Sequence, residues 1–122
     1  MSENGGNLGF TLKESKFDYF FGHVRSNLRN QQRALQNLAD LRQLGIDEAV
    51  GGRERLLQIF QDGLNAPETG RHISDYGITI TRRVELRGGA IEVKYFYSDG
   101  DLSSTPEIVT IIPKVYRQES DL

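Results

Sequence analysis

The spacing of apolar residues changes part-way along the chain, and this change constrains the fold most strongly. Before Pro67 the apolar residues recur at helical spacing, whereas after it they alternate with polar residues. Helices followed by antiparallel strands predict an α+β fold, with N-terminal helices packed on an antiparallel sheet of three or more strands. The 122 residues are enough for one domain with a single core.

Three helices are predicted in the first half of the chain, over residues 16–21, 27–44 and 47–61. Apolar residues at helical spacing give the second and third helices one buried stripe each. The residues expected to be largely buried are Leu35, Leu38, Leu41, Leu57, Phe60, Ile80, Val84, Val93 and Ile111. We assign a single domain to residues 15–116, with flexible segments at 1–14 and 117–122.

Three strands are predicted in the second half, over residues 78–86, 91–97 and 108–112. Gly88-Gly89 has the composition of a two-residue hairpin loop, and this loop would place Arg83 opposite Lys94. The polar face of this hairpin carries carboxylates and cations in alternation. It is either a solvated lattice of ion pairs or a site for proton transfer and phosphate binding.

Composition narrows the classes of function. The net charge of −2 and the pI of about 5.7 disfavour a dedicated nucleic-acid-binding protein, although a local basic surface remains compatible with them. The absence of cysteine excludes disulfides and thiolate chemistry. No apolar run approaches the roughly 18 residues of a membrane helix, and residues 1–6 have no features of a signal peptide.

One face of the second predicted helix is rich in cations and amides. Arg25, Arg29 and Arg33 recur every fourth residue and therefore stack along that face, with Asn30 and Asn37 close to it. Guanidinium groups with neighbouring amides are suited to phosphates and polar bases. The alternative is an ordinary solvated face.

The remaining residues favour acid–base chemistry without a metal or a cofactor. The two histidines have no partner at metal-ligand spacing, and no nucleotide-binding glycine motif is present. RNA carries its own nucleophile in the 2′-hydroxyl, so a ribonuclease needs only a base, an acid and cations that hold the phosphate. The residues predicted to be catalytic are His72, Lys94, Thr110 and Arg33. The residues predicted to bind RNA are His23, Arg25, Arg29, Asn30, Arg83 and Tyr95.

Two segments carry a resemblance to a known family. They are Gly22-His23-Val24 … Asn30-x-x-Arg33-x-x-Gln36-Asn37 … Leu44-Gly45-Ile46 and the later strand Val109-Thr110-Ile111-Ile112-Pro113. The pattern resembles the C-terminal toxin domains of polymorphic and contact-dependent inhibition systems, which are similar to the barnase/EndoU/colicin/RelE group of ribonucleases. The resemblance implies a metal-independent ribonuclease that cleaves tRNA or other structured RNA in the cytoplasm of a target cell. It also implies a cognate immunity protein as partner.

A second hypothesis is a non-catalytic interaction module that retains the toxin-like fold. The acidic pI favours this alternative, whereas the face of arginines and asparagines favours the enzyme.

Overall fold

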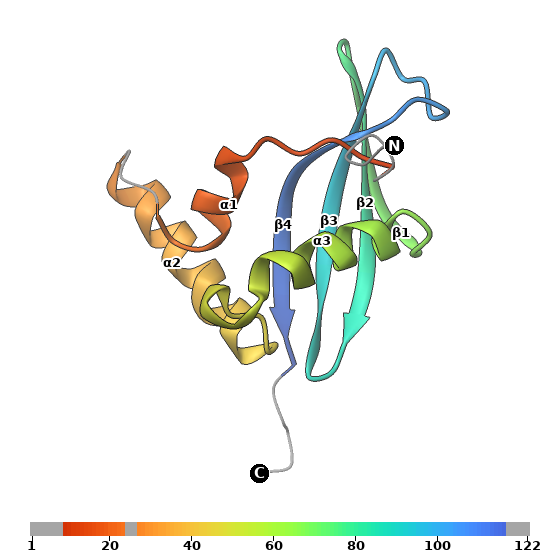
Figure 1. Cartoon of the computed structure of the whole chain (residues 1–122). Coiled ribbons are helices and arrows are strands. Elements are labelled where there is room, and N and C mark those ends of the chain that lie inside the picture. Colours follow the sequence, from red (N-terminus) through yellow and green to blue (C-terminus); the bar gives the residue numbers. More distant parts are fainter. Residues whose placement is uncertain (1–8, 24–26, 117–122) are drawn as a thin grey trace, which may run out of the picture.

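The computed structural model describes residues 9–23 and 27–116 of the chain. Its elements are α1 (Ser15–Phe20), α2 (Leu28–Gln43), the 3-10 helix η2 (Glu48–Val50), α3 (Gly52–Gly63), β1 (Glu68–Ser74), β2 (Gly77–Leu86), β3 (Gly89–Ser98) and β4 (Glu107–Val115). The strands form one antiparallel sheet in the order β1-β2-β3-β4 (Figure 1). The predicted α+β class is confirmed.

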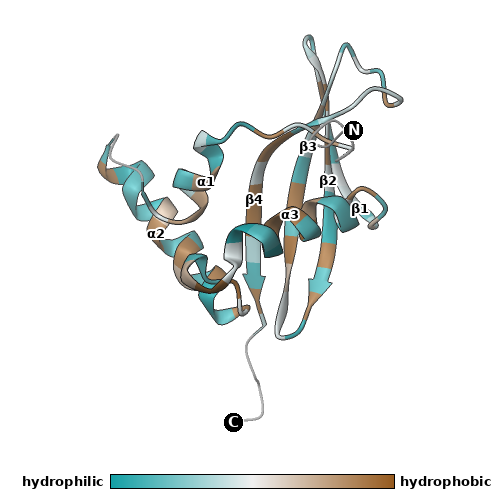
Figure 2. Cartoon of the chain, in the orientation of Figure 1, coloured by the Kyte–Doolittle hydropathy of each residue, from teal (hydrophilic) through white to brown (hydrophobic). Residues whose placement is uncertain are grey.

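The helices do not form one layer over the sheet. Figure 1 shows α3 lying across one face, whereas α1 and α2 lie beside β4 at the edge. The core fills the space between α3, the helix pair and the sheet, and apolar positions alternate with polar ones along the strands (Figure 2). No described helix has the length and apolar character needed to cross a bilayer.

The packing of α2 at the sheet edge changes which of its residues are buried. The helix begins at Asn27, whose side-chain oxygen accepts a hydrogen bond from the Asn30 backbone N–H at 2.8 Å. Ala34 and Leu41 are fully buried, whereas Leu35 is 56% exposed. The prediction that Leu35 is buried is therefore wrong. The edge of a sheet covers a narrower stripe of a helix than the face of a sheet would cover.

Strand β1 was not predicted from the sequence. Almost all of its side chains are exposed, because it is an edge strand with little packed on either side. Its polar sequence therefore lacks the alternation that identifies a half-buried strand. It pairs with β2 from Glu68 to Ser74 and widens the sheet on the side away from α2.

The turn between β2 and β3 lies one residue earlier than predicted. Leu86 pairs with Gly89, so the loop residues are Arg87 and Gly88, and only Gly88 needs its positive φ of 86°. Gly89 belongs to the strand, where a Cβ atom would lie 2.0 Å from the Lys114 carbonyl oxygen.

This shift in the loop changes the register of the polar face. Arg83 pairs with Glu92, whereas Lys94 pairs with Thr81. The predicted pairing of Arg83 with Lys94 is therefore wrong, and opposite charges face each other instead of like charges.

A β-bulge interrupts β4. Lys94 pairs with Thr110 and the next residue, Tyr95, pairs with Ile108, so Val109 is an additional residue. The bulge allows Ile108 and Ile111 to be buried together. It also places Thr110 on the opposite face, beside Lys94.

The domain begins earlier than the predicted boundary at residue 15. Phe10 is 3% exposed and its ring meets the Phe60 ring edge-to-face at 5.8 Å. Thr11 forms a parallel bridge with Glu107 at the start of β4. The segment that includes Phe10 and Thr11 thus belongs to the folded domain, while residues 1–8 and 117–122 lie outside the described part of the chain.

Candidate functional site

Four residues form one cross-strand row on the sheet face that α3 does not cover. The row runs Gly70, Thr81, Lys94, Thr110, one residue from each strand. The Lys94 ammonium donates a hydrogen bond to the Thr81 hydroxyl at 3.2 Å. Gly70 has no side chain, so this position of β1 adds no side chain to the row. The row therefore presents one cation between two hydroxyls.

Arg33 comes to the Thr110 end of this row from α2. A pocket of about 370 Å³ is lined by Tyr19, Arg33, Gln36, Asn37, Thr110, Ile111 and Ile112. We refer to it as the Thr110 pocket. Its walls are α1 and α2 on one side and β4 on the other (Figure 1). Three of the four predicted catalytic residues, Arg33, Lys94 and Thr110, thus lie at one site.

His72, the fourth predicted catalytic residue, lies at the opposite edge of the sheet. It pairs with Thr79, and its side chain is exposed on the same face as Lys94. Two strand spacings and an offset of two residues along the strands separate its backbone from that of Lys94, about 12 Å, and a third spacing brings the separation from Thr110 to about 16 Å. His72 therefore lies at the Gly70 end of the row, away from the Thr110 pocket.

Arg83 lies on the same face but is already paired with carboxylates. Its guanidinium contacts Glu85 at 2.7 Å and Glu92 at 3.5 Å, and it also donates to the Tyr116 hydroxyl. The hydrogen bonds with Glu85 and Tyr116 raise the pKa of Arg83. The hydrogen bond from Arg83, and then that from Tyr116, lowers the pKa of Glu85. A phosphate would therefore have to compete with these carboxylates for Arg83.

Tyr95 lies on the other face of the sheet, within the core. It is fully buried, and its hydroxyl donates to the Phe60 carbonyl oxygen at 2.7 Å. This burial raises the pKa of Tyr95. It also contradicts the predicted base-stacking role of Tyr95, since no face of the ring is accessible. The neighbouring Phe96 is half-buried on the face that carries Lys94.

The other predicted RNA-binding residues lie away from the Thr110 pocket. His23 is exposed, and its Nε2 lies 2.7 Å from a carboxylate oxygen of Glu48. Arg29 is exposed in the first turn of α2. The backbone N–H of Asn30 donates a hydrogen bond to the side-chain oxygen of Asn27, which caps the helix. Arg25 lies outside the described residues. Among the described arginines and asparagines of this predicted face, Arg33 and Asn37 line the pocket, whereas Arg29 and Asn30 do not.

Several residues that line the site were not among those predicted to be catalytic or to bind RNA. Tyr19 and Lys16 from α1 and Gln36 and Asn37 from α2 lie along β4. Lys16 and Tyr19 are three residues apart on a helix, a spacing that places them on one face, but the sequence does not show what that face meets. Within the described residues, no three His, Cys, Asp or Glu side chains are placed to hold a metal ion.

The comparisons with known proteins give a match in fold, although none in sequence. No protein-family model and no curated protein sequence matches the chain. A chain in the solved structure of a contact-dependent growth inhibition toxin–immunity protein complex from Klebsiella pneumoniae 342 superposes with a TM-score of 0.69 at 21% identity. The match covers 85% of this chain and 99% of that chain, so the two share a fold over nearly all of the latter.

Proposed function

We propose that this chain is a metal-independent ribonuclease toxin domain that cleaves tRNA or another structured RNA. The fold that it shares with a chain of a contact-dependent growth inhibition toxin–immunity complex supports the toxin class. The row of Thr81, Lys94 and Thr110, with Arg33 beside it, supports chemistry on a phosphodiester.

In this reaction the 2′-oxygen of the RNA attacks the adjacent phosphorus atom, and the bond from phosphorus to the 5′-oxygen breaks. A base removes the proton of the 2′-hydroxyl, and an acid supplies a proton to the leaving 5′-oxygen. Lys94 and Arg33 stabilise the negative charge that develops on the phosphoryl oxygens, and the Thr110 hydroxyl donates a hydrogen bond to them. His72, which is exposed on the same sheet face as Lys94, is the group proposed to exchange the protons, and its distance from Lys94 and Thr110 requires water between the imidazole and the reacting oxygens.

The observation that carries the proposal is the availability of the Lys94 charge. Within the described residues, Lys94 has no carboxylate at ion-pair distance, and its ammonium bonds only to the neutral Thr81 hydroxyl. Arg83, on the same face, is paired with two carboxylates. A half-buried ammonium between hydroxyls is a favourable partner for a phosphate oxygen.

Replacing Arg33 with alanine is expected to lower RNA cleavage by about tenfold or more, because a hydrogen bond to a charged group contributes about 1.5–3 kcal/mol. The free energy of unfolding is expected to change by less than about 1 kcal/mol, since Arg33 is exposed. The matched control is Arg42→Ala on the same helix, which should cleave RNA at the normal rate. A large loss of stability in Arg33→Ala would assign that residue a structural role.

A cognate immunity protein is proposed as the partner, because a toxin of this class must be neutralised in the cell that makes it. Growth measurements in bacteria test the toxic activity on which this proposal rests. Induced expression of the chain should arrest growth, and expression of Lys94→Ala should not. Normal growth with intact RNA, or protection against another toxin, would instead favour the non-catalytic interaction module.

A further inference from the structure

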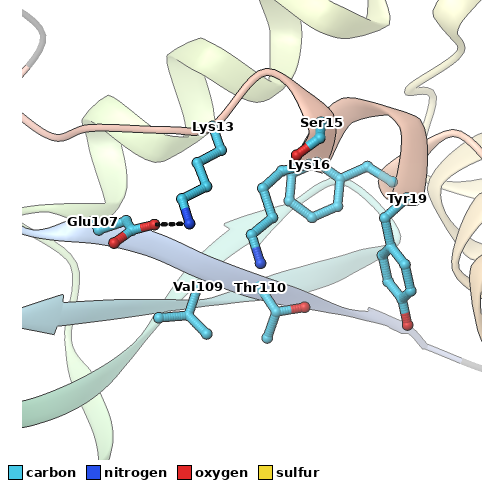
Figure 3. A pocket seen from close by; sticks show the side chains of 8 residues that line it. Lys13, Ser15, Lys16, Tyr19, Glu107, Val109 and Thr110 are labelled. Carbon is cyan, nitrogen blue, oxygen red and sulfur yellow. Dashed lines mark ion pairs between the residues drawn. The ribbon is translucent and has the colours of Figure 1, made fainter.

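A second pocket adjoins the Thr110 pocket along β4. It has a volume of about 570 Å³ and is lined by Lys13, Ser15, Lys16, Tyr19, Phe20, Glu107, Val109 and Thr110 (Figure 3). We refer to it as the α1 pocket. Tyr19 and Thr110 line both pockets, so the two pockets lie next to each other along β4. Each volume lies within the range of about 300–1,000 Å³ that is typical of small-ligand pockets.

The two lysines of the α1 pocket differ in their partners. The Lys13 ammonium lies 4.0 Å from a carboxylate oxygen of Glu107. Lys16 has no such partner in the part of the chain that the structure describes, and Figure 3 shows its ammonium extending toward Thr110. Lys16 therefore supplies an available positive charge close to the hydroxyl that the proposed reaction uses.

Tyr19 forms the wall between the two pockets. It lies one helical turn from Lys16, and its half-buried ring packs against the core on one side. Figure 3 shows the ring beside Thr110 with its hydroxyl directed past the strand. An aromatic ring between two pockets of nucleotide size is placed to stack on an unpaired base.

We infer that the α1 pocket binds the nucleotide adjacent to the cleaved phosphodiester, with Lys16 on its phosphate and Tyr19 on its base. This inference rests on the proposed ribonuclease function and specifies its substrate as RNA that is single-stranded at the cleavage site. In a duplex the bases are stacked inside the helix, so their faces are closed to Tyr19.

The test is the binding of a short fluorescent 2′-O-methyl oligonucleotide, followed by fluorescence anisotropy over a range of salt concentrations. The 2′-O-methyl group blocks the attacking oxygen, so binding is measured without cleavage. Lys16→Ala is expected to weaken binding about tenfold and to reduce the dependence of log affinity on log salt by about 0.7, the loss of one phosphate contact to a single strand. Tyr19→Leu is expected to weaken binding about tenfold, within the measured range for base stacking.

The matched control is Arg55→Ala, which removes an exposed cation from α3 on the other face of the sheet. It should bind as the unaltered chain does. Normal affinity in both Lys16→Ala and Tyr19→Leu would overturn the inference, and so would equal affinity for the oligonucleotide annealed to its complement. If the oligonucleotide binds as expected but cellular RNA is not cleaved, the subsite is supported and the proposed ribonuclease function fails.

Discussion

Replacing Lys94 with alanine is expected to lower RNA cleavage by about 100-fold or more, the scale of removing one charge-stabilising group from a reacting centre. The protein should remain folded, because the half-buried ammonium makes one hydrogen bond, to a threonine hydroxyl. Arg87→Ala is the matched control, since it removes an exposed cation from the β2–β3 turn. Full activity of Lys94→Ala would contradict the assignment of the phosphate to the cross-strand row.

The same measurement of RNA cleavage tests whether His72 transfers the proton. His72→Ala is expected to lower cleavage by about 100-fold, the usual contribution of a general acid or base. If His72→Ala retains full activity, another group transfers the proton. Glu92, two residues from Lys94 on the same face, is then the nearest carboxylate in the strand.

Replacing Gly63 with alanine is expected to lower the free energy of unfolding by about 3 kcal/mol, the upper range for overpacking a core. A Cβ atom at this position would lie 2.2 Å from the Tyr95 hydroxyl oxygen and 3.3 Å from the ring carbon that carries it. Tyr95 is fully buried and bonded to the Phe60 carbonyl oxygen, so it has little freedom to move. Without this clash, alanine in place of glycine would favour the helix.

A double variant identifies the clash as the cause. Tyr95→Phe removes the hydroxyl and alone should cost about 1–3 kcal/mol, because the buried Phe60 carbonyl loses its donor. In the Tyr95→Phe protein, Gly63→Ala should lower the free energy of unfolding by about 1 kcal/mol or less. Denaturant unfolding measures this difference, provided that the slope of free energy against denaturant concentration stays the same. If the two substitutions lower the free energy of unfolding additively in the double variant, the close contact between α3 and β3 is contradicted. Tyr95→Phe should leave RNA cleavage unchanged, since its ring lies away from the two pockets.

Much of the architecture follows from local sequence patterns. The leucines of α2, the glycine that ends it and the alternation along β2 and β3 predict their elements correctly. The polar edge strand β1 lacks such a pattern, because neither of its faces is strongly buried. The exposure of Leu35 depends on the placement of α2 at the edge of the sheet, which its periodicity does not encode.

The candidate site depends more heavily on tertiary structure. Thr110 reaches Lys94 only because the additional residue Val109 shifts the alternation of β4, and the strand sequence gives no sign of this bulge. Lys94 faces Thr81 because the turn lies at Arg87. Arg33 and Thr110 were predicted as candidates by residue type, but their meeting requires the edge packing of α2. Tyr95 was predicted to bind RNA but is buried in the core. An aromatic residue in a strand suits either position, and the residue type does not distinguish them.

The most direct test of the ribonuclease function is incubation of the purified chain with total tRNA in excess EDTA, followed by analysis of the RNA ends. We expect cleavage at the same rate with and without EDTA, with 2′,3′-cyclic phosphate and 5′-hydroxyl ends. The Lys94→Ala protein should leave the RNA intact over the same time. Intact RNA with the unaltered chain, or cleavage that stops when EDTA is added, would contradict a metal-independent ribonuclease function.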